Sequence, residues 1–240
     1  MKNIWKNKYL IIMFFVFLLW IKQENIVNAS TNEVINNVQI ENDNHQTDNK
    51  IIWFVSMYDI IEYPVFKNIL NEKIVNQIIF DEIEKIYNSY EFTPESVVEF
   101  TVEYADENYL SILFSGYIFN EGFAYAATIL WPVMIDIKNG KKLALNDIVN
   151  INKTFMEWFI QQLENYFNDL GNDIYKRYSK EEIHEKVLKA DTDTIDEYPC
   201  VTSYFTKEKL CINFPIPRYL GEFIEVEILF AELNKKINIE

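Results

Sequence analysis

The stretch YLSILFSGYIFNEGFAYAATILWPVMIDIKNGKKLAL, residues 109–145, decides the fold. Residues 109–118 alternate between an apolar side and a mixed side, which predicts a strand with one buried face. The apolar side holds Leu110, Ile112, Phe114 and Ile118, and the mixed side holds Tyr109, Ser111, Leu113, Ser115 and Tyr117. Residues 123–131 predict a second strand. Asn139-Gly140 predicts a type I′ hairpin turn, because both residues accept positive φ angles. The stretch therefore predicts an antiparallel meander.

Two long helices are expected, one before this meander in the sequence and one after it. Apolar residues recur at steps of three and four over residues 66–87 and again over 153–170, which predicts amphipathic helices. Pro64 suits the start of the first helix, while Asn152 can cap the second and Gly171 can end it. Further strands are expected at residues 51–57, 95–104 and 222–230, and residues 200–214 are expected to form another hairpin. We therefore expect an α+β fold in which an antiparallel, twisted sheet carries two long amphipathic helices.

The first 29 residues have the pattern of a secretory signal peptide. Lys2, Lys6 and Lys8 precede an apolar run over residues 9–21, which is short for a transmembrane helix, and cleavage is expected after Ala29. An uncleaved N-terminal anchor is the alternative. Residues 30–50 are rich in Asn and other polar residues, which predicts a disordered linker. The chain is therefore expected to be secreted or displayed on the cell surface, with no membrane contact after cleavage.

The net charge restricts the partners that the folded part can bind. The chain carries −15 overall, and residues 1–29 hold four lysines and one glutamate, so the remainder carries −18. Such a surface repels nucleic acid and anionic lipid, and it attracts basic proteins or metal cations. The charge also has a simpler interpretation, which is that it keeps an exported protein soluble and monomeric.

The sequence contains few of the motifs and residue types that catalytic sites use. There is no phosphate-binding loop and no nucleophile elbow, and the chain holds only two histidines. Glu99 and Glu103 fall on one side of an expected strand, where they would form either the carboxylate pair of a glycosidase or a hydrated sheet face. Cys200 and Cys211 permit one disulfide in an exported chain, or they are two buried thiols. Neither cysteine has a partner at zinc-ligand spacing, so no metal site and no cofactor are expected.

Several segments together resemble the RsiV/PdaC-type extracellular domain. The resemblance covers about residues 51–233 and depends on Tyr63-Pro64, Asn71 and the segments YLSILFSGY (109–117), MIDIKNGKKLALND (134–147), YFTKEKL (204–210) and FPIPRYLGEFIEVEI (214–228). Family usage divides this region near residue 132, which gives halves at 51–131 and 132–240. The family occurs in Gram-positive bacteria, in RsiV-type anti-sigma factors, in PdaC-type peptidoglycan deacetylases and in stand-alone exported chains.

The chain departs from the family in three places. Only about eight residues precede the apolar run, where an anti-sigma segment would lie, and no deacetylase domain follows. The family often has Gly-Gly-Ala-His after the first central strand, whereas this chain has Glu121-Gly122-Phe123-Ala124-Tyr125. Any role that the family attaches to that loop is therefore not carried over.

The resemblance implies an exported, non-enzymatic binding domain. In RsiV-type proteins this region binds lysozyme, which suits an acidic surface that meets a basic enzyme. The expected ligand is a lysozyme-like basic protein or a cell-wall glycan, and the expected binding residues lie near loops: Tyr117, Glu121, Phe123, Tyr125 and Tyr219. The alternatives are a peptidoglycan hydrolase that uses carboxylates such as Glu99 and Glu103, and a purely structural surface domain.

Overall fold

The structure, a computed structural model, describes residues 52–57, 60–119, 126–171, 174–192 and 200–236. The expected signal peptide and linker lie outside these residues. Within them, no helix is both long and apolar enough to cross a membrane.

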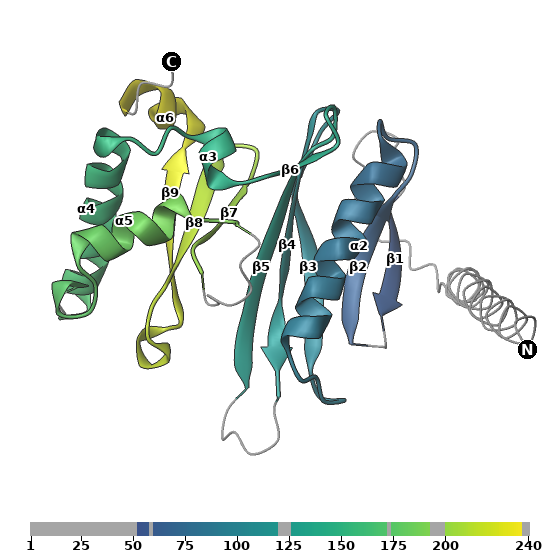
Figure 1. The fold of residues 1–240 in the computed structure, drawn as a ribbon, viewed down its shortest axis with the longest axis horizontal. Coiled ribbons are helices and arrows are strands. Elements are labelled where there is room, and N and C mark those ends of the chain that lie inside the picture. Colours follow the sequence, from purple (N-terminus) through teal and green to yellow (C-terminus); the bar gives the residue numbers. More distant parts are fainter. Residues whose placement is uncertain (1–51, 58–59, 120–125, 172–173, 193–199, 237–240) are drawn as a thin grey trace, which may run out of the picture. The chain divides into compact units, whose positions relative to one another are not determined.

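The first sheet has six strands in the order β1-β2-β3-β4-β5-β6 (Figure 1). The strands are β1 (Ile52–Met57), β2 (Ile61–Phe66), β3 (Val97–Ala105), β4 (Tyr109–Ile118), β5 (Ala127–Asp136) and β6 (Lys141–Leu143). All neighbours pair antiparallel except β2 and β3, which are parallel. A parallel pair needs a crossover, and helix α2 (Glu72–Ser89) supplies it. The expected meander is confirmed as β4, β5 and β6.

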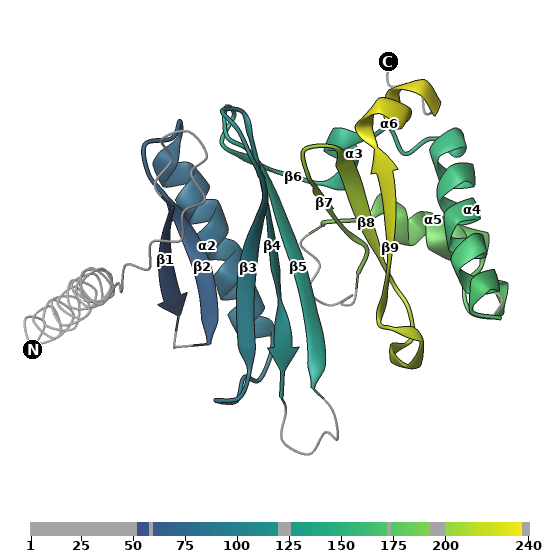
Figure 2. The same cartoon turned by 180° about the vertical axis from the view of Figure 1, so that it is seen from behind.

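Helix α2 covers one face of this sheet and lies in front of it in Figure 1 and behind it in Figure 2. The core between them is made of α2 residues and of the alternating apolar residues of the strands. Its fully buried members include Val75, Ile79, Ile83, Ile86, Ile112, Phe114, Ile129 and Val133. The apolar side of β4 that the alternation predicted is therefore the side that packs against the helix.

The second sheet has three antiparallel strands, β7 (Thr202–Phe205), β8 (Lys209–Pro215) and β9 (Phe223–Leu229). Among the described residues, four helices accompany it: α3 (Leu145–Ile148), α4 (Lys153–Asp169), α5 (Lys180–Leu188) and α6 (Phe230–Lys236). The same part of the chain includes the short 3-10 turns η1 (Ile174–Lys176) and η3 (Arg218–Leu220). The apolar stripe of α4, with Phe155, Phe159 and Leu163, joins Leu210, Ile212 and Phe214 in one buried core.

The expected α+β class and both long helices are confirmed, but three details differ. The strands form two sheets, and each long helix packs against its own sheet. The first helix begins at Glu72 and not near residue 66, because Asn68 and Asn71 have φ angles of 59° and 53°. The predicted hairpin between β5 and β6 forms, but the predicted type I′ turn is wrong. The loop consists of residues 137–140, and Asn139 does not have a positive φ angle. Asp136 instead accepts a hydrogen bond from the Asn139 N–H at 2.9 Å.

The ends of helix α4 confirm the predicted signals. The Asn152 side chain accepts a hydrogen bond from the Phe155 N–H at 3.0 Å, and Gly171 has a φ angle of 66°.

Strand β7 joins the second sheet to the first. It lies beside β5 in both views (Figures 1 and 2), and the Phe205 N–H donates to the buried Ser111 hydroxyl of β4 at 3.1 Å. Tyr104 of β3 packs on the Phe205 ring, with 5.6 Å between the ring centroids. The Asp191 carboxylate adds a polar connection, because it accepts hydrogen bonds from the Leu145 N–H at 3.0 Å and from the Ser203 N–H at 2.7 Å.

Asp191 makes the stability of the fold depend on pH. Burial raises the pKa of its carboxyl to about 6, although hydrogen bonds from Ser203 and the charge of Lys142 oppose the rise. Because this folded-state pKa exceeds the unfolded value, the folded protein binds the proton more tightly. The free energy of unfolding should therefore rise by about 2–3 kcal/mol, relative to a variant that cannot titrate here, as the pH falls from 7 to 4.

This prediction can be checked by urea unfolding of the parent protein and of Asp191→Asn between pH 4 and 7. The variant loses hydrogen bonds at every pH, so it is less stable throughout. The informative quantity is how the difference in the free energy of unfolding between the two proteins changes with pH. A difference that stays constant over this range would show that the carboxyl does not titrate with a raised pKa.

Candidate functional site

The structure describes two of the five predicted binding residues. Glu121, Phe123 and Tyr125 lie outside the described residues. Tyr117, near the end of β4, and Tyr219, in η3, are both described, and 59% and 67% of their surfaces are exposed. These are large apolar rings in contact with solvent, and they come from different sheets.

One contact connects the ends of the two sheets that carry these rings. The Arg218 guanidinium, next to Tyr219, donates to the backbone carbonyl of Ala126. Ala126 immediately precedes β5, where Ala127 pairs with Ile118 and Thr128 pairs with Tyr117. In Figures 1 and 2 the end of β4 and the start of β5 lie at the same end of the molecule as the β8–β9 connection. The Arg218–Ala126 contact therefore connects the segment that carries Tyr219 to the start of β5, whose strand partner β4 carries Tyr117.

Phe119 is a third exposed ring at this end, and the sequence reasoning did not select it. It is 45% exposed, and its N–H donates to the buried Ser96 hydroxyl at 3.1 Å. Val97, the strand partner of Tyr117, is also 48% exposed. We name Tyr117, Phe119 and Tyr219 the aromatic rim. Clusters of exposed apolar side chains commonly mark interaction sites.

The Tyr219 end of the rim is held by several polar contacts. The Arg177 guanidinium lies 5.0 Å from the centroid of the Tyr219 ring. The Arg218 Nε pairs with the Glu222 carboxylate at 2.9 Å, and the Tyr178 hydroxyl donates to the Pro215 carbonyl at 3.3 Å. Tyrosine and arginine are the residues that most often dominate protein interfaces. The rim therefore has the composition of a binding hot spot and is partly ordered in advance.

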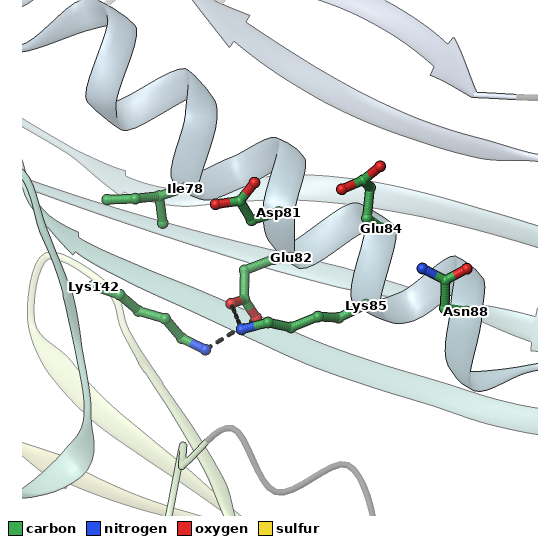
Figure 3. Close-up of a pocket in the computed structure, with 7 residues that line it drawn as sticks. All are labelled: Ile78, Asp81, Glu82, Glu84, Lys85, Asn88 and Lys142. Atoms are coloured by element: carbon green, nitrogen blue, oxygen red, sulfur yellow. Dashed lines mark hydrogen bonds and ion pairs between the residues drawn. The ribbon is translucent and has the colours of Figure 1, made fainter. Parts of the chain in front are cut away.

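A second feature is a cavity of about 510 Å³ along helix α2 (Figure 3). Its lining includes a carboxylate, Glu82, of which only 2% of the residue surface is exposed. Glu82 lies 2.7 Å from the Lys85 ammonium and 3.0 Å from that of Lys142, and it accepts a hydrogen bond from the Trp131 indole at 2.9 Å. These groups join α2 to β5 and β6, so we assign the cluster a structural role. The sequence reasoning missed it because Glu82 looks like an ordinary charge on the polar side of a helix.

Glu99 and Glu103 lie on the same strand and not across a cleft from one another. Glu99 pairs with Ser115, and Glu103 lies at an irregularity in the pairing of β3 with β4. Four residues along a strand span about 13 Å, whereas glycosidase carboxylates are separated by about 5–9.5 Å. Burial and the nearby charge of Glu225 raise the pKa of Glu103. The arrangement does not fit a glycosidase pair.

Cys200 and Cys211 are both free thiols, so the predicted possible disulfide is not formed. The strand register explains this result, because Cys211 lies opposite Tyr204, four residues beyond Cys200. An extended chain covers about 13 Å over four residues, and a disulfide needs Cα atoms within about 7 Å.

The comparisons with known proteins identify no family for this chain. No protein-family model matches it, and no curated protein matches it. Among solved structures, one similar chain is a DUF3298 family protein from Pseudomonas aeruginosa PAO1, from a family named for a domain of unknown function. That similarity covers 72% of this chain and 82% of the other, with 16% identity and a TM-score of 0.42.

Proposed function

We propose that this chain is an exported, non-enzymatic binding domain that contacts its partner through the aromatic rim. The observation that carries the proposal is the exposure of two tyrosines, Tyr117 and Tyr219, on segments of two different sheets that the Arg218–Ala126 hydrogen bond connects. Burying large exposed rings against a partner releases water from apolar surface, and the Arg177 guanidinium already lies over the Tyr219 ring before binding.

The proposed partner is a basic protein of the lysozyme type. The chain carries −15, so it attracts a cationic protein over distances that exceed direct contact. The rim then supplies short-range contacts that salt does not screen. The sequence resemblance to the RsiV/PdaC-type domain supports the same partner. The other candidate ligand is a cell-wall glycan, which lacks the positive charge that this steering requires.

Calorimetric titration of the purified chain with lysozyme tests the proposal. We expect saturable binding that weakens only moderately between low and physiological salt, because the rim contributes an apolar component. Binding that disappears with modest salt would reduce the interaction to generic charge attraction, and the rim would have no role. Soluble wall fragments, titrated in parallel, separate the glycan from the protein partner.

Replacing both rim tyrosines should weaken lysozyme binding by about 100-fold, because two hot-spot rings each contribute about 1–2 kcal/mol. The variant is Tyr117→Ser with Tyr219→Ser, and the measurement is the dissociation constant. Tyr166→Ser is the matched control, since Tyr166 is also a partly exposed tyrosine but lies on α4. Equal affinities for the double variant and the control would remove the rim from the interface.

A turnover assay distinguishes binding from hydrolysis. We expect no release of soluble fragments from purified peptidoglycan, because Glu99 and Glu103 are too far apart along β3 to act as a pair. Release that Glu103→Gln abolishes would replace the binding proposal by an enzymatic one.

A further inference from the structure

The side of the second sheet that faces away from the α4 core carries a compact polar cluster. Strand alternation places Leu210 and Ile212 in the core and directs Cys211 and Asn213 to the opposite side. The β8–β9 register sets Cys211 opposite Glu227 and Asn213 opposite Glu225. Directly opposed side chains on one sheet face are neighbours, so these four residues adjoin each other.

Three of these residues could coordinate a metal ion together. The Cys211 Sγ and one carboxylate oxygen each from Glu225 and Glu227 all lie within 4.8 Å of one another. The thiol is buried, whereas both carboxylates are exposed. The Glu225 carboxylate accepts a hydrogen bond from the Tyr204 hydroxyl at 2.7 Å and the Glu227 carboxylate pairs with the Lys209 ammonium at 2.6 Å, so an ion would compete with these contacts. Zinc–ligand bonds are about 2.0–2.3 Å long, so the carboxylates would have to close in slightly.

Two buried polar side chains lie on the same side of the sheet as this cluster. Asn213 is 1% exposed and Thr202, its partner on β7, is 7% exposed. The Asn213 Nδ2 and the Thr202 Oγ1 have no hydrogen-bond partner among the described residues. Buried polar groups without partners are costly and uncommon in folded proteins. An amide flip exchanges the nitrogen and the oxygen of the Asn213 side chain, so the oxygen can take the place of the unpartnered nitrogen.

The charges around the cluster also favour a cation. Glu225 and Glu227 are joined by Glu103 of β3, whose pKa is raised by burial first and by the charge of Glu225 second. Lys209 offsets part of this negative charge through an ion pair with Glu227 at 2.6 Å. Three neighbouring carboxylates therefore face one lysine in this cluster.

We propose that Cys211, Glu225 and Glu227, with Asn213 as a fourth ligand, form a binding site for one divalent zinc-type cation. A thiolate with carboxylates selects a borderline-soft ion such as Zn²⁺ over Mg²⁺ or Ca²⁺, which prefer ligand sets made of oxygen alone. The sequence did not indicate the site, because its ligands come from two strands and not from one closely spaced motif. The site is separate from the aromatic rim and does not depend on the proposed function.

Binding must displace a proton from the thiol. Burial raises the pKa of Cys211 to about 11, so the thiol is protonated in the metal-free protein at neutral pH. When Zn²⁺ binds, the S–H bond breaks, the sulfur keeps the electron pair to form the S–Zn bond, and the proton goes to the buffer. One proton should therefore be released from the thiol for each ion bound.

Calorimetric titration of the purified chain with Zn²⁺ in two buffers of different ionisation enthalpy tests the proposal. We expect one ion per chain with proton release, and we expect Co²⁺ in place of Zn²⁺ to give thiolate-to-metal charge-transfer absorption. Cys211→Ser should abolish that absorption, and Glu227→Gln, a change at an exposed position, should weaken Zn²⁺ binding by at least about tenfold. Cys200→Ser and Glu208→Gln are the matched controls and should leave both signals unchanged.

Several results would overturn the proposal. The absence of Zn²⁺ binding would do so, as would binding without cobalt–thiolate absorption. Binding that Cys200→Ser weakens as much as Glu227→Gln would also overturn it, because the ion would then be held elsewhere.

Discussion

Replacing Gly116 by alanine is expected to lower the free energy of unfolding by about 3 kcal/mol or more. A Cβ atom at this position would lie 1.9 Å from the Val97 carbonyl oxygen and 2.9 Å from the Val98 Cα. Both atoms belong to the backbone of β3, which cannot move aside without breaking its pairing with β4. Urea unfolding at neutral pH measures the effect.

Gly171→Ala is the control for this substitution. Gly171 has a φ angle of 66°, and no atom lies within 4 Å of the position that its Cβ would take. Its replacement should therefore cost only the backbone penalty of about 1–2 kcal/mol. If Gly116→Ala costs no more than Gly171→Ala, the close approach of β3 to β4 at Gly116 is incorrect.

Removing the buried carboxylate in Glu82→Ala is expected to destabilise the protein by about 3 kcal/mol. The change leaves the ammonium groups of Lys85 and Lys142 without this counter-charge, and it takes away the acceptor of the Trp131 indole N–H. Both lysine side chains keep some exposure, at 28% and 23%, so water compensates part of the loss. The expected cost therefore lies at the lower end for a buried ion pair.

Glu84→Ala is the matched control, because Glu84 lines the same cavity from an exposed position on α2. An exposed helix position of this kind should change the stability by no more than about 0.5 kcal/mol. If the two variants have the same dependence of unfolding free energy on urea concentration, the difference between their unfolding midpoints gives the contribution of the buried group. Similar midpoints for the two variants would mean that the Glu82 cluster does not hold α2 to β5 and β6.

The sequence predicted the elements that depend on local pattern. The alternation of Ile112 and Phe114 gave the buried face of β4, and Asn152 gave the start of α4. It placed the first helix too early, because residues 66–70 continue the helical spacing although β2 extends to Phe66. Leu70 is in fact exposed, so its apolar character did not report burial. The spacing of apolar residues alone cannot distinguish a helix from the strand and turn that precede it, because that distinction depends on tertiary contacts.

Features that depend on contacts distant in the sequence could not be predicted. The division into two sheets follows from which strands pair, and the alternation in β8 or β9 does not record their partners. The sequence predicts Tyr117 and Tyr219 to lie near loops, but it does not show that Arg218, next to Tyr219, contacts Ala126 at the start of β5. The Cys211 cluster is likewise created by the β8–β9 register.

Amide hydrogen exchange of the chain, alone and saturated with lysozyme, tests the central claim most directly. The claim is that the two connected hairpin ends form one binding surface. We predict slower exchange on binding in residues 114–119 and in residues 216–222 together, with helix α4 unchanged. Protection of only one of these segments, or protection confined to α4, would contradict the account.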